Sequence, residues 1–198
     1  MTLADKVTSL RIVLAPVFCI IYLFPVLFPA WPAAAAPWTV PVLGTLFIIA
    51  ELTDLLDGQI ARRRHEVGDF GKLFDPFADV LVRVSYFLCF VVTGILPVLP
   101  FLLVLYREFG ILFLRLLMMK RGIAMGARWG GKIKAVLYMA AGALALIAVS
   151  LERLGLDTVP SRAFRLAAVV IFYVSVLISL LSFADYIMVY RRAIKTGV

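Results

Sequence analysis

Charged residues are scarce in this sequence, and histidine and cysteine are scarcer still. Of its 198 residues 16% are charged, whereas a soluble domain averages about 25%. The single histidine, His65, has neither cysteine near it in the sequence, and both Cys19 and Cys89 lie within apolar runs. These counts argue against a disulfide framework and against a metal site built from histidine and cysteine.

Apolar residues, by contrast, are in excess, at 64% of the chain against roughly 45–50% in soluble domains. The excess extends over the whole length, without a repeat, a low-complexity tract or a long linker. This composition predicts an all-α integral membrane protein in which residues 1–198 form a single polytopic domain.

Six segments are apolar enough for transmembrane helices, which need about 20 residues each. Proline and glycine mark turns between several of them. The predicted spans are Ile12–Phe28, Val40–Ala61, Pro76–Leu96, Phe101–Met119, Ala135–Leu151 and Ala163–Val189.

Lysine and arginine are distributed unequally between the two sides of these spans. The formal net charge is +8, but the basic residues flank apolar segments, so we expect no nucleic-acid partner. Only Arg153, Arg162 and Arg165 fall on the sparsely charged side. The positive-inside rule then places both termini in the cytoplasm. Lys6 and Arg11, next to apolar residues, predict a short interfacial N-terminal helix on membrane lipid.

Two pairs of aspartates break the apolar pattern near the cytoplasmic side. Asp54 and Asp57 are three residues apart at the end of the second span, and Asp75 and Asp79 are four apart at the start of the third. Each pair shares a helix face. Four converging carboxylates would repel one another unless cations lie between them, and oxygen ligands of this kind suit Mg²⁺, Mn²⁺ or Ca²⁺.

Two other interpretations of this acidic segment remain open at this point. The aspartates could form ion pairs at a helix end with Arg62, Arg63 and Arg64. Intramembrane carboxylates also occur along ion pathways, so a cation transporter or channel is the alternative class.

A group of basic residues near the ends of spans four and five predicts an anion pocket. Gly130 and Gly131 begin the fifth helix, whose first amides can receive a phosphate. A structural ion pair between Glu108 and Arg115, seven residues apart, is the alternative. The candidate phosphate ligands are Arg107, Arg115, Arg128, Lys132 and Lys134.

The acidic segment resembles the signature of the CDP-alcohol phosphatidyltransferase family, D-x2-D-G-x2-A-R-x8-G-x3-D-x3-D. All eight positions match, and they are Asp54, Asp57, Gly58, Ala61, Arg62, Gly71, Asp75 and Asp79. The stretches DKVTSLRIVLAPVF, REFGILFLRLL and GARWGGKIKAVL are similar to the bacterial branch that uses glycerol 3-phosphate. Asp5, Val80 and Ala135 depart from that branch, which commonly has Asn, Lys and Thr there.

The resemblance implies a reaction and roles for these residues. A hydroxyl of glycerol 3-phosphate would attack the phosphorus that joins CDP to diacylglycerol, giving phosphatidylglycerophosphate and CMP. Asp54, Asp57, Asp75 and Asp79 would hold Mg²⁺ or Mn²⁺, with Asp79 also the base. The CDP-lipid would contact Asp54, Asp57, Gly58, Ala61, Arg62, Gly71 and Asp75.

The resemblance also implies a homodimer. The distribution of lysine and arginine places the active site on the cytoplasmic face of the cell membrane. Inositol phosphate, serine and phosphatidylglycerol are alternative acceptors within the same family. The basic residues of spans four and five favour an acceptor that carries its own phosphate.

Overall fold

The computed structural model describes residues 3–29, 36–64, 69–122, 129–156 and 159–195. Within these ranges the chain forms six α-helices and no β-strand, so the all-α class is confirmed for them. Each helix contains one predicted span or nearly all of it. The helices are α1 (Leu3–Leu27), α2 (Ala36–Arg64), α3 (Asp69–Val92), α4 (Val98–Lys120), α5 (Trp129–Arg153) and α6 (Val159–Lys195).

Three of the described helices are long and apolar enough to cross a membrane. Their apolar stretches are Thr8–Leu27, Ile133–Arg153 and Val159–Arg192, and α2 has a shorter one, Pro37–Thr53. In α3 and α4, charged residues such as Asp79 and Arg107 interrupt the apolar sequence. The helices are therefore those of a membrane protein, while the count of six spans stays a prediction.

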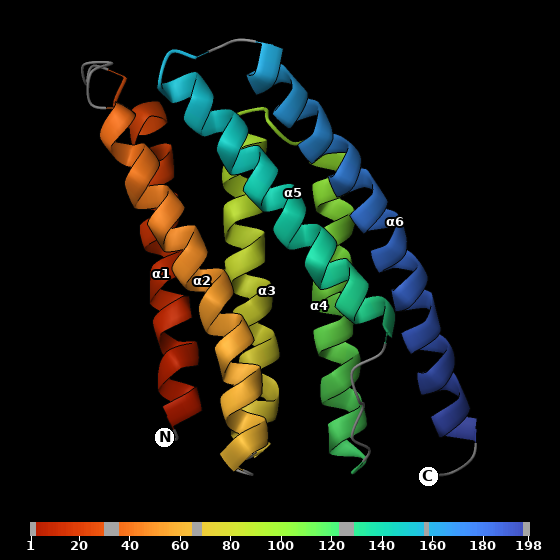
Figure 1. Ribbon diagram of the computed structural model, residues 1–198. Coiled ribbons are helices and arrows are strands. Elements are labelled where there is room, and N and C mark those ends of the chain that lie inside the picture. Colours follow the sequence, from red (N-terminus) through yellow and green to blue (C-terminus); the bar gives the residue numbers. More distant parts are fainter. Residues whose placement is uncertain (1–2, 30–35, 65–68, 123–128, 157–158, 196–198) are drawn as a thin grey trace.

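Successive helices run in alternating directions through one bundle (Figure 1). α1 packs against α2 and α3, α3 also contacts α4 and α5, and α5 contacts α2 and α6, which in turn packs on α4. The start of α1 and the end of α6 lie at the same end of the bundle as the α2–α3 and α4–α5 helix ends (Figure 1). We call this the terminus end and the opposite one the far end.

Three of the described helices are followed by a glycine in the left-handed region. Gly94, Gly122 and Gly155 follow α3, α4 and α5 with φ angles of 73°, 75° and 73°. After α3 the N–H of Ile95 donates to the carbonyl of Phe90 at 2.8 Å, which satisfies a carbonyl at the helix end. Only glycine adopts such a φ at no steric cost, and the turns predicted at Gly94 and Gly155 are confirmed.

Aromatic rings from several helices fill the core. The Phe87 ring lies 4.7 Å from that of Tyr86 and 4.8 Å from that of Phe172 on α6, between ring centroids. A methyl group at Gly142 of α5 would lie only 3.1 Å from Tyr86 and 3.2 Å from Phe47. Close packing of this kind holds α3, α5 and α6 in the positions that the site requires.

The interfacial helix predicted before the first span is not a separate element. α1 is continuous from Leu3 to Leu27, and Thr8 and Arg11 are buried within the bundle. No glycine or proline occurs between Leu3 and Ala15 to end a short helix, so the first turns continue into the apolar stretch. The prediction was wrong on this point.

Candidate active site

Two of the predicted aspartates lie on one face of α3, near the terminus end. Asp75 accepts a hydrogen bond from the hydroxyl of Thr8 on α1, with 2.7 Å between Oγ1 and Oδ1. Asp79 forms an ion pair with Arg83 one turn further on, with 2.9 Å between Oδ1 and Nη2. Both carboxylates are therefore held in defined positions.

The other signature residues lie where α2 ends and α3 begins, both at the terminus end (Figure 1). The helical backbone of α2 keeps Asp54 and Asp57 on one face. The side chains of six signature residues lie outside the part of the chain that the structure describes. These are Asp54, Asp57, Gly58, Ala61 and Arg62 in α2 and Gly71 in α3.

The metal site predicted from the four aspartates stays a prediction. Among the described side chains, no three or more of His, Cys, Asp and Glu gather closely enough to hold an ion. Asp75 and Asp79 are the two described members of the predicted set. Their carboxylate oxygens are donors that Mg²⁺ and Mn²⁺ prefer.

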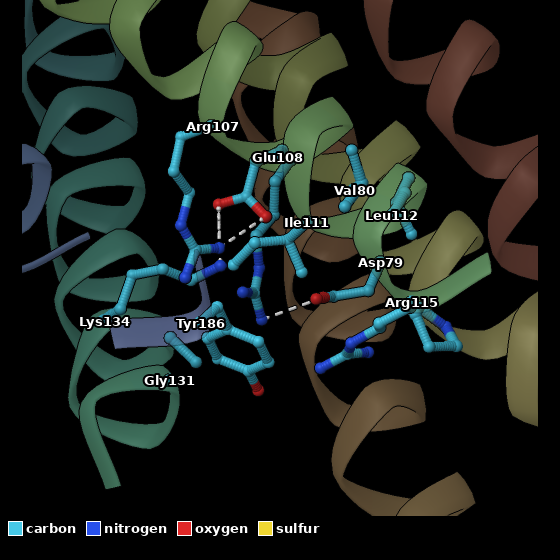
Figure 2. A pocket seen from close by; sticks show the side chains of 13 residues that line it. Asp79, Val80, Arg107, Glu108, Ile111, Leu112, Arg115, Gly131, Lys134 and Tyr186 are labelled. Atoms are coloured by element: carbon cyan, nitrogen blue, oxygen red, sulfur yellow. Dashed lines mark hydrogen bonds and ion pairs between the residues drawn. The ribbon is translucent and has the colours of Figure 1, made fainter. Parts of the chain in front are cut away.

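A cavity of about 230 Å³ opens beside Asp79, enclosed by α3, α4, α5 and α6 (Figure 2). It is smaller than the roughly 300–1,000 Å³ typical of sites for drug-sized ligands, so it suits a small molecule. Its lining combines apolar residues with charged ones, and the charged ones are Asp79, Arg83, Arg107, Glu108, Arg115 and Lys134.

Glu108 accepts ion pairs from two buried cations in this cavity. Its Oε1 lies 2.9 Å from Nη1 of Arg107 and 2.7 Å from Nζ of Lys134. Arg107 also donates from Nε to the carbonyl of Ser179 on α6 at 3.2 Å. One carboxylate thus joins α4 to α5, and Arg107 joins α4 to α6.

Glu108 does not form the alternative ion pair with Arg115; its partners are Arg107 and Lys134. Seven residues place Arg115 about 10 Å further along the axis of α4, whereas Lys134 approaches Glu108 directly from α5. Arg115 instead lines the cavity, and its buried Nε has no hydrogen-bond partner among the described residues (Figure 2). A buried donor without a partner is costly, which indicates a ligand at this position.

The charges around the cavity do not balance. Among the described side chains that line it, Arg83, Arg107, Arg115 and Lys134 are cationic, and Asp79 and Glu108 are carboxylates. Four cations against two carboxylates leave a surplus of two positive charges in a partly buried space. Such a surplus favours an anionic ligand.

Three of the five predicted phosphate ligands, Arg107, Arg115 and Lys134, therefore line one cavity. Arg128 lies outside the described residues, and so does the side chain of Lys132, although its backbone belongs to α5. Gly131, in the first turn of α5, borders the cavity. The start of α5 thus reaches the cavity at Gly131, while phosphate binding by its first amides stays a prediction.

Two polar residues of the described cavity lining, Arg83 and Tyr186, had no predicted role. Arg83 could have been found, because its spacing of four from Asp79 puts both on one helix face. Tyr186 lies on α6, more than 100 residues from Asp79 in the sequence, and no local pattern connects the two. Its place in the lining follows only from how α6 packs against α4 and α5.

Comparison with known proteins agrees with the signature. A family model described as CDP-alcohol phosphatidyltransferase matches residues 1–181. The chain belongs to the CDP-alcohol phosphatidyltransferase family. It is therefore a transferase, which removes the ground for interpreting the acidic segment as part of a cation transporter.

The bacterial relatives include two proteins named CDP-diacylglycerol–glycerol-3-phosphate 3-phosphatidyltransferase. The protein from Treponema pallidum is 36% identical over 200 residues, which cover 98% of this chain and 92% of the relative. The protein from Bacillus subtilis is 36% identical over 136 residues, which cover 67% of this chain and 69% of the relative.

Proposed function

We propose that this protein transfers the phosphatidyl group of CDP-diacylglycerol to glycerol 3-phosphate, forming phosphatidylglycerophosphate and CMP. The observation that carries the proposal is the positively charged cavity beside Asp79. A phosphate monoester carries about −1.5 to −2 charges near neutral pH, so glycerol 3-phosphate would balance the surplus of two. The names of both relatives support the same reaction.

Asp79 is the proposed base. It borders the acceptor cavity, and Arg83 holds its carboxylate in place. In the proposed step the carboxylate takes the proton of the acceptor hydroxyl. The hydroxyl oxygen then forms a bond to the phosphorus that links CDP to diacylglycerol, and the bond from that phosphorus to CMP breaks.

The acceptor phosphate would bind among the cations that line the cavity. Arg115 is its principal proposed ligand, because its Nε has no partner among the described residues. Arg107 and Lys134 add positive charge while Glu108 holds them in place. Arg128 and Lys132, next to the start of α5, complete the proposed set.

The CDP-lipid would bind where α2 ends and α3 begins. Gly58, Ala61 and Gly71 leave room for the nucleotide beside Arg62 and the aspartates. When bound by Asp54, Asp57, Asp75 and Asp79, Mg²⁺ or Mn²⁺ would neutralise the pyrophosphate and the departing nucleotide phosphate. The oxygen-only donor set fits either ion.

The proposal includes the placement of the protein in the membrane. All six helices would cross the cell membrane, with both termini and the active site on the cytoplasmic side, where lysine and arginine gather. The acyl chains would then stay in lipid while the head group meets the aspartates. The homodimer implied by the family resemblance remains a prediction.

The other acceptors of the family differ in charge. Free serine has no phosphate and would leave the surplus of two unbalanced. An inositol phosphate carries the same group as glycerol 3-phosphate, so charge alone does not distinguish these two. An assay with several acceptors is therefore the decisive test of the proposed function.

The assay measures CMP release by the purified protein in detergent with CDP-diacylglycerol and Mg²⁺. Glycerol 3-phosphate, inositol phosphate, serine and phosphatidylglycerol are each supplied as the acceptor. We expect the fastest release with glycerol 3-phosphate. Faster release with serine or inositol would overturn the acceptor assignment and leave the family assignment intact.

A further inference from the structure

The side chain of Tyr186 is the one large polar group in the described cavity lining to which the proposed reaction gives no role. It comes from α6, is only 2% exposed, and borders the cavity. In the view of Figure 2 its ring lies between Gly131 on one side and Asp79 and Arg115 on the other. It therefore borders the part of the cavity next to Asp79 and Arg115, where the acceptor would bind.

The hydroxyl of Tyr186 has no hydrogen-bond partner among the described residues. Other buried tyrosines of the bundle do have one: the Tyr138 hydroxyl donates to Ser179 at 3.0 Å, and that of Tyr22 pairs with Thr93 at 2.8 Å. Buried tyrosine hydroxyls usually find such a partner. The Tyr186 hydroxyl oxygen is not one of the fully enclosed polar atoms without a partner, so it is open to the cavity, where a ligand can reach it.

The acceptor has one polar group that the other residues leave without a partner. Glycerol 3-phosphate carries a phosphate, a reacting primary hydroxyl and a secondary hydroxyl between them. The cations match the phosphate and Asp79 matches the reacting hydroxyl, so the secondary hydroxyl would lie in the middle of the cavity. A neutral phenol is suited to a neutral hydroxyl because each can donate or accept.

We propose that Tyr186 is a specificity-determining residue whose hydroxyl forms a hydrogen bond with the non-reacting secondary hydroxyl of the acceptor. This inference rests on the proposed function, since it takes glycerol 3-phosphate as the acceptor. It adds a reason for the protein to select a three-carbon phosphate that carries a secondary hydroxyl. Apolar cavity residues such as Ile111 and Leu112 provide no such contact.

The test combines one variant with one acceptor analogue. Wild type, Tyr186→Phe and Tyr190→Phe are each assayed for CMP release with sn-glycerol 3-phosphate and with 3-hydroxypropyl phosphate, which lacks only the secondary hydroxyl. Tyr190 lies one turn along α6 and is absent from the cavity lining, so its variant is the matched control. Melting temperatures of all three proteins are measured in the same detergent.

Wild type should prefer glycerol 3-phosphate over the analogue by roughly three- to tenfold in kcat/KM, the value of one hydrogen bond. Tyr186→Phe should lose that preference and use both acceptors equally, mainly through a higher KM for glycerol 3-phosphate. Tyr190→Phe should keep the wild-type preference.

Three results would overturn the inference. In the first, wild type uses the two acceptors equally, a result that does not depend on whether any variant folds. In the second, Tyr186→Phe weakens both acceptors by the same factor, which would place the phenol on the phosphate or in a structural role. In the third, wild type releases CMP with serine but not with glycerol 3-phosphate, and then the proposed function fails as well.

Discussion

Arg153 and Arg115 both lie in apolar helices, but at opposite ends of the bundle and in different surroundings. At the far end, Arg153 donates to Thr39 Oγ1 at 2.8 Å and to the carbonyl of Tyr22 at 2.6 Å. It also lies over the Tyr22 ring, 4.7 Å from its centroid. Toward the terminus end, Arg115 borders a cavity, and its Nε has no partner among the described residues.

The same contrast holds for the neighbours of each arginine. At the far end Arg165 donates to the carbonyl of Gly94 at 2.6 Å, so it joins the start of α6 to the turn after α3. Among the described side chains around the cavity, four cations face two carboxylates. A guanidinium whose donors reach protein atoms on other helices holds those helices together, whereas unmatched positive charge beside a cavity provides a place for an anion.

The largest expected loss of turnover follows from replacing a carboxylate at the terminus end. Asp75→Asn keeps the shape of the side chain but removes a charged ligand, so turnover at saturating Mg²⁺ should fall by several orders of magnitude. Glu152→Gln, near the far end, is the control and should retain wild-type turnover. If purified, monodisperse Asp75→Asn keeps more than about a tenth of wild-type turnover, the metal assignment is wrong.

The second largest effect is expected on the free energy of unfolding, when a buried carboxylate is neutralised. Glu108→Gln leaves Arg107 and Lys134 buried without their carboxylate, and loss of one partner in a buried pair costs about 3–5 kcal/mol in the free energy of unfolding. Glu152 pairs with Arg165 at 3.9 Å in a partly exposed position, so Glu152→Gln should cost at most about 1 kcal/mol. Melting in detergent measures both, and equal losses would refute the structural role of Glu108.

A smaller effect, on KM or on the melting temperature, should distinguish the role of Arg115 from that of Arg153. Arg115→Ala should raise the KM for glycerol 3-phosphate about tenfold or more, since a charge-assisted contact contributes roughly 1.5–3 kcal/mol. Its KM for CDP-diacylglycerol and its melting temperature should change little. Arg153→Ala should do the reverse, with a lower melting temperature and both KM values unchanged. A lower melting temperature for Arg115→Ala without a KM change would identify Arg115 as structural.

The smallest effect on activity is expected from cysteine substitutions at exposed helix ends, which test the orientation of the protein in the membrane. In a variant without Cys19 and Cys89, a single cysteine is placed at Arg121, beyond α4, or at Leu156, beyond α5; both positions are exposed. Turnover should stay within about twofold, as for most surface substitutions. An impermeant thiol reagent should label the Arg121 position only from the cytoplasm and the Leu156 position only from outside. The opposite pattern would place the active site on the other face.

Much of the fold was predictable because it depends on local sequence. Apolar runs bounded by glycine and proline located all six helices, and the glycine turns after α3 and α5 were confirmed. The expected break after the first turns of α1 was wrong because amphipathic composition does not end a helix in the absence of a breaking residue. Basic residues next to apolar ones suited a lipid surface, yet Arg11 is buried in the bundle.

By itself, the sequence determined the class of protein, the helical spans and the family signature, because hydropathy and helical spacing are properties of neighbouring residues. It also placed Arg107, Arg115 and Lys134 together as candidates for one pocket. Only the tertiary structure decided how these charges are paired: Glu108 binds Arg107 and Lys134, and Arg115 remains beside the cavity. The packing of α6 brought Tyr186 to the same place. Contacts of this kind depend on which faces of distant helices meet, and no spacing along a single helix specifies that.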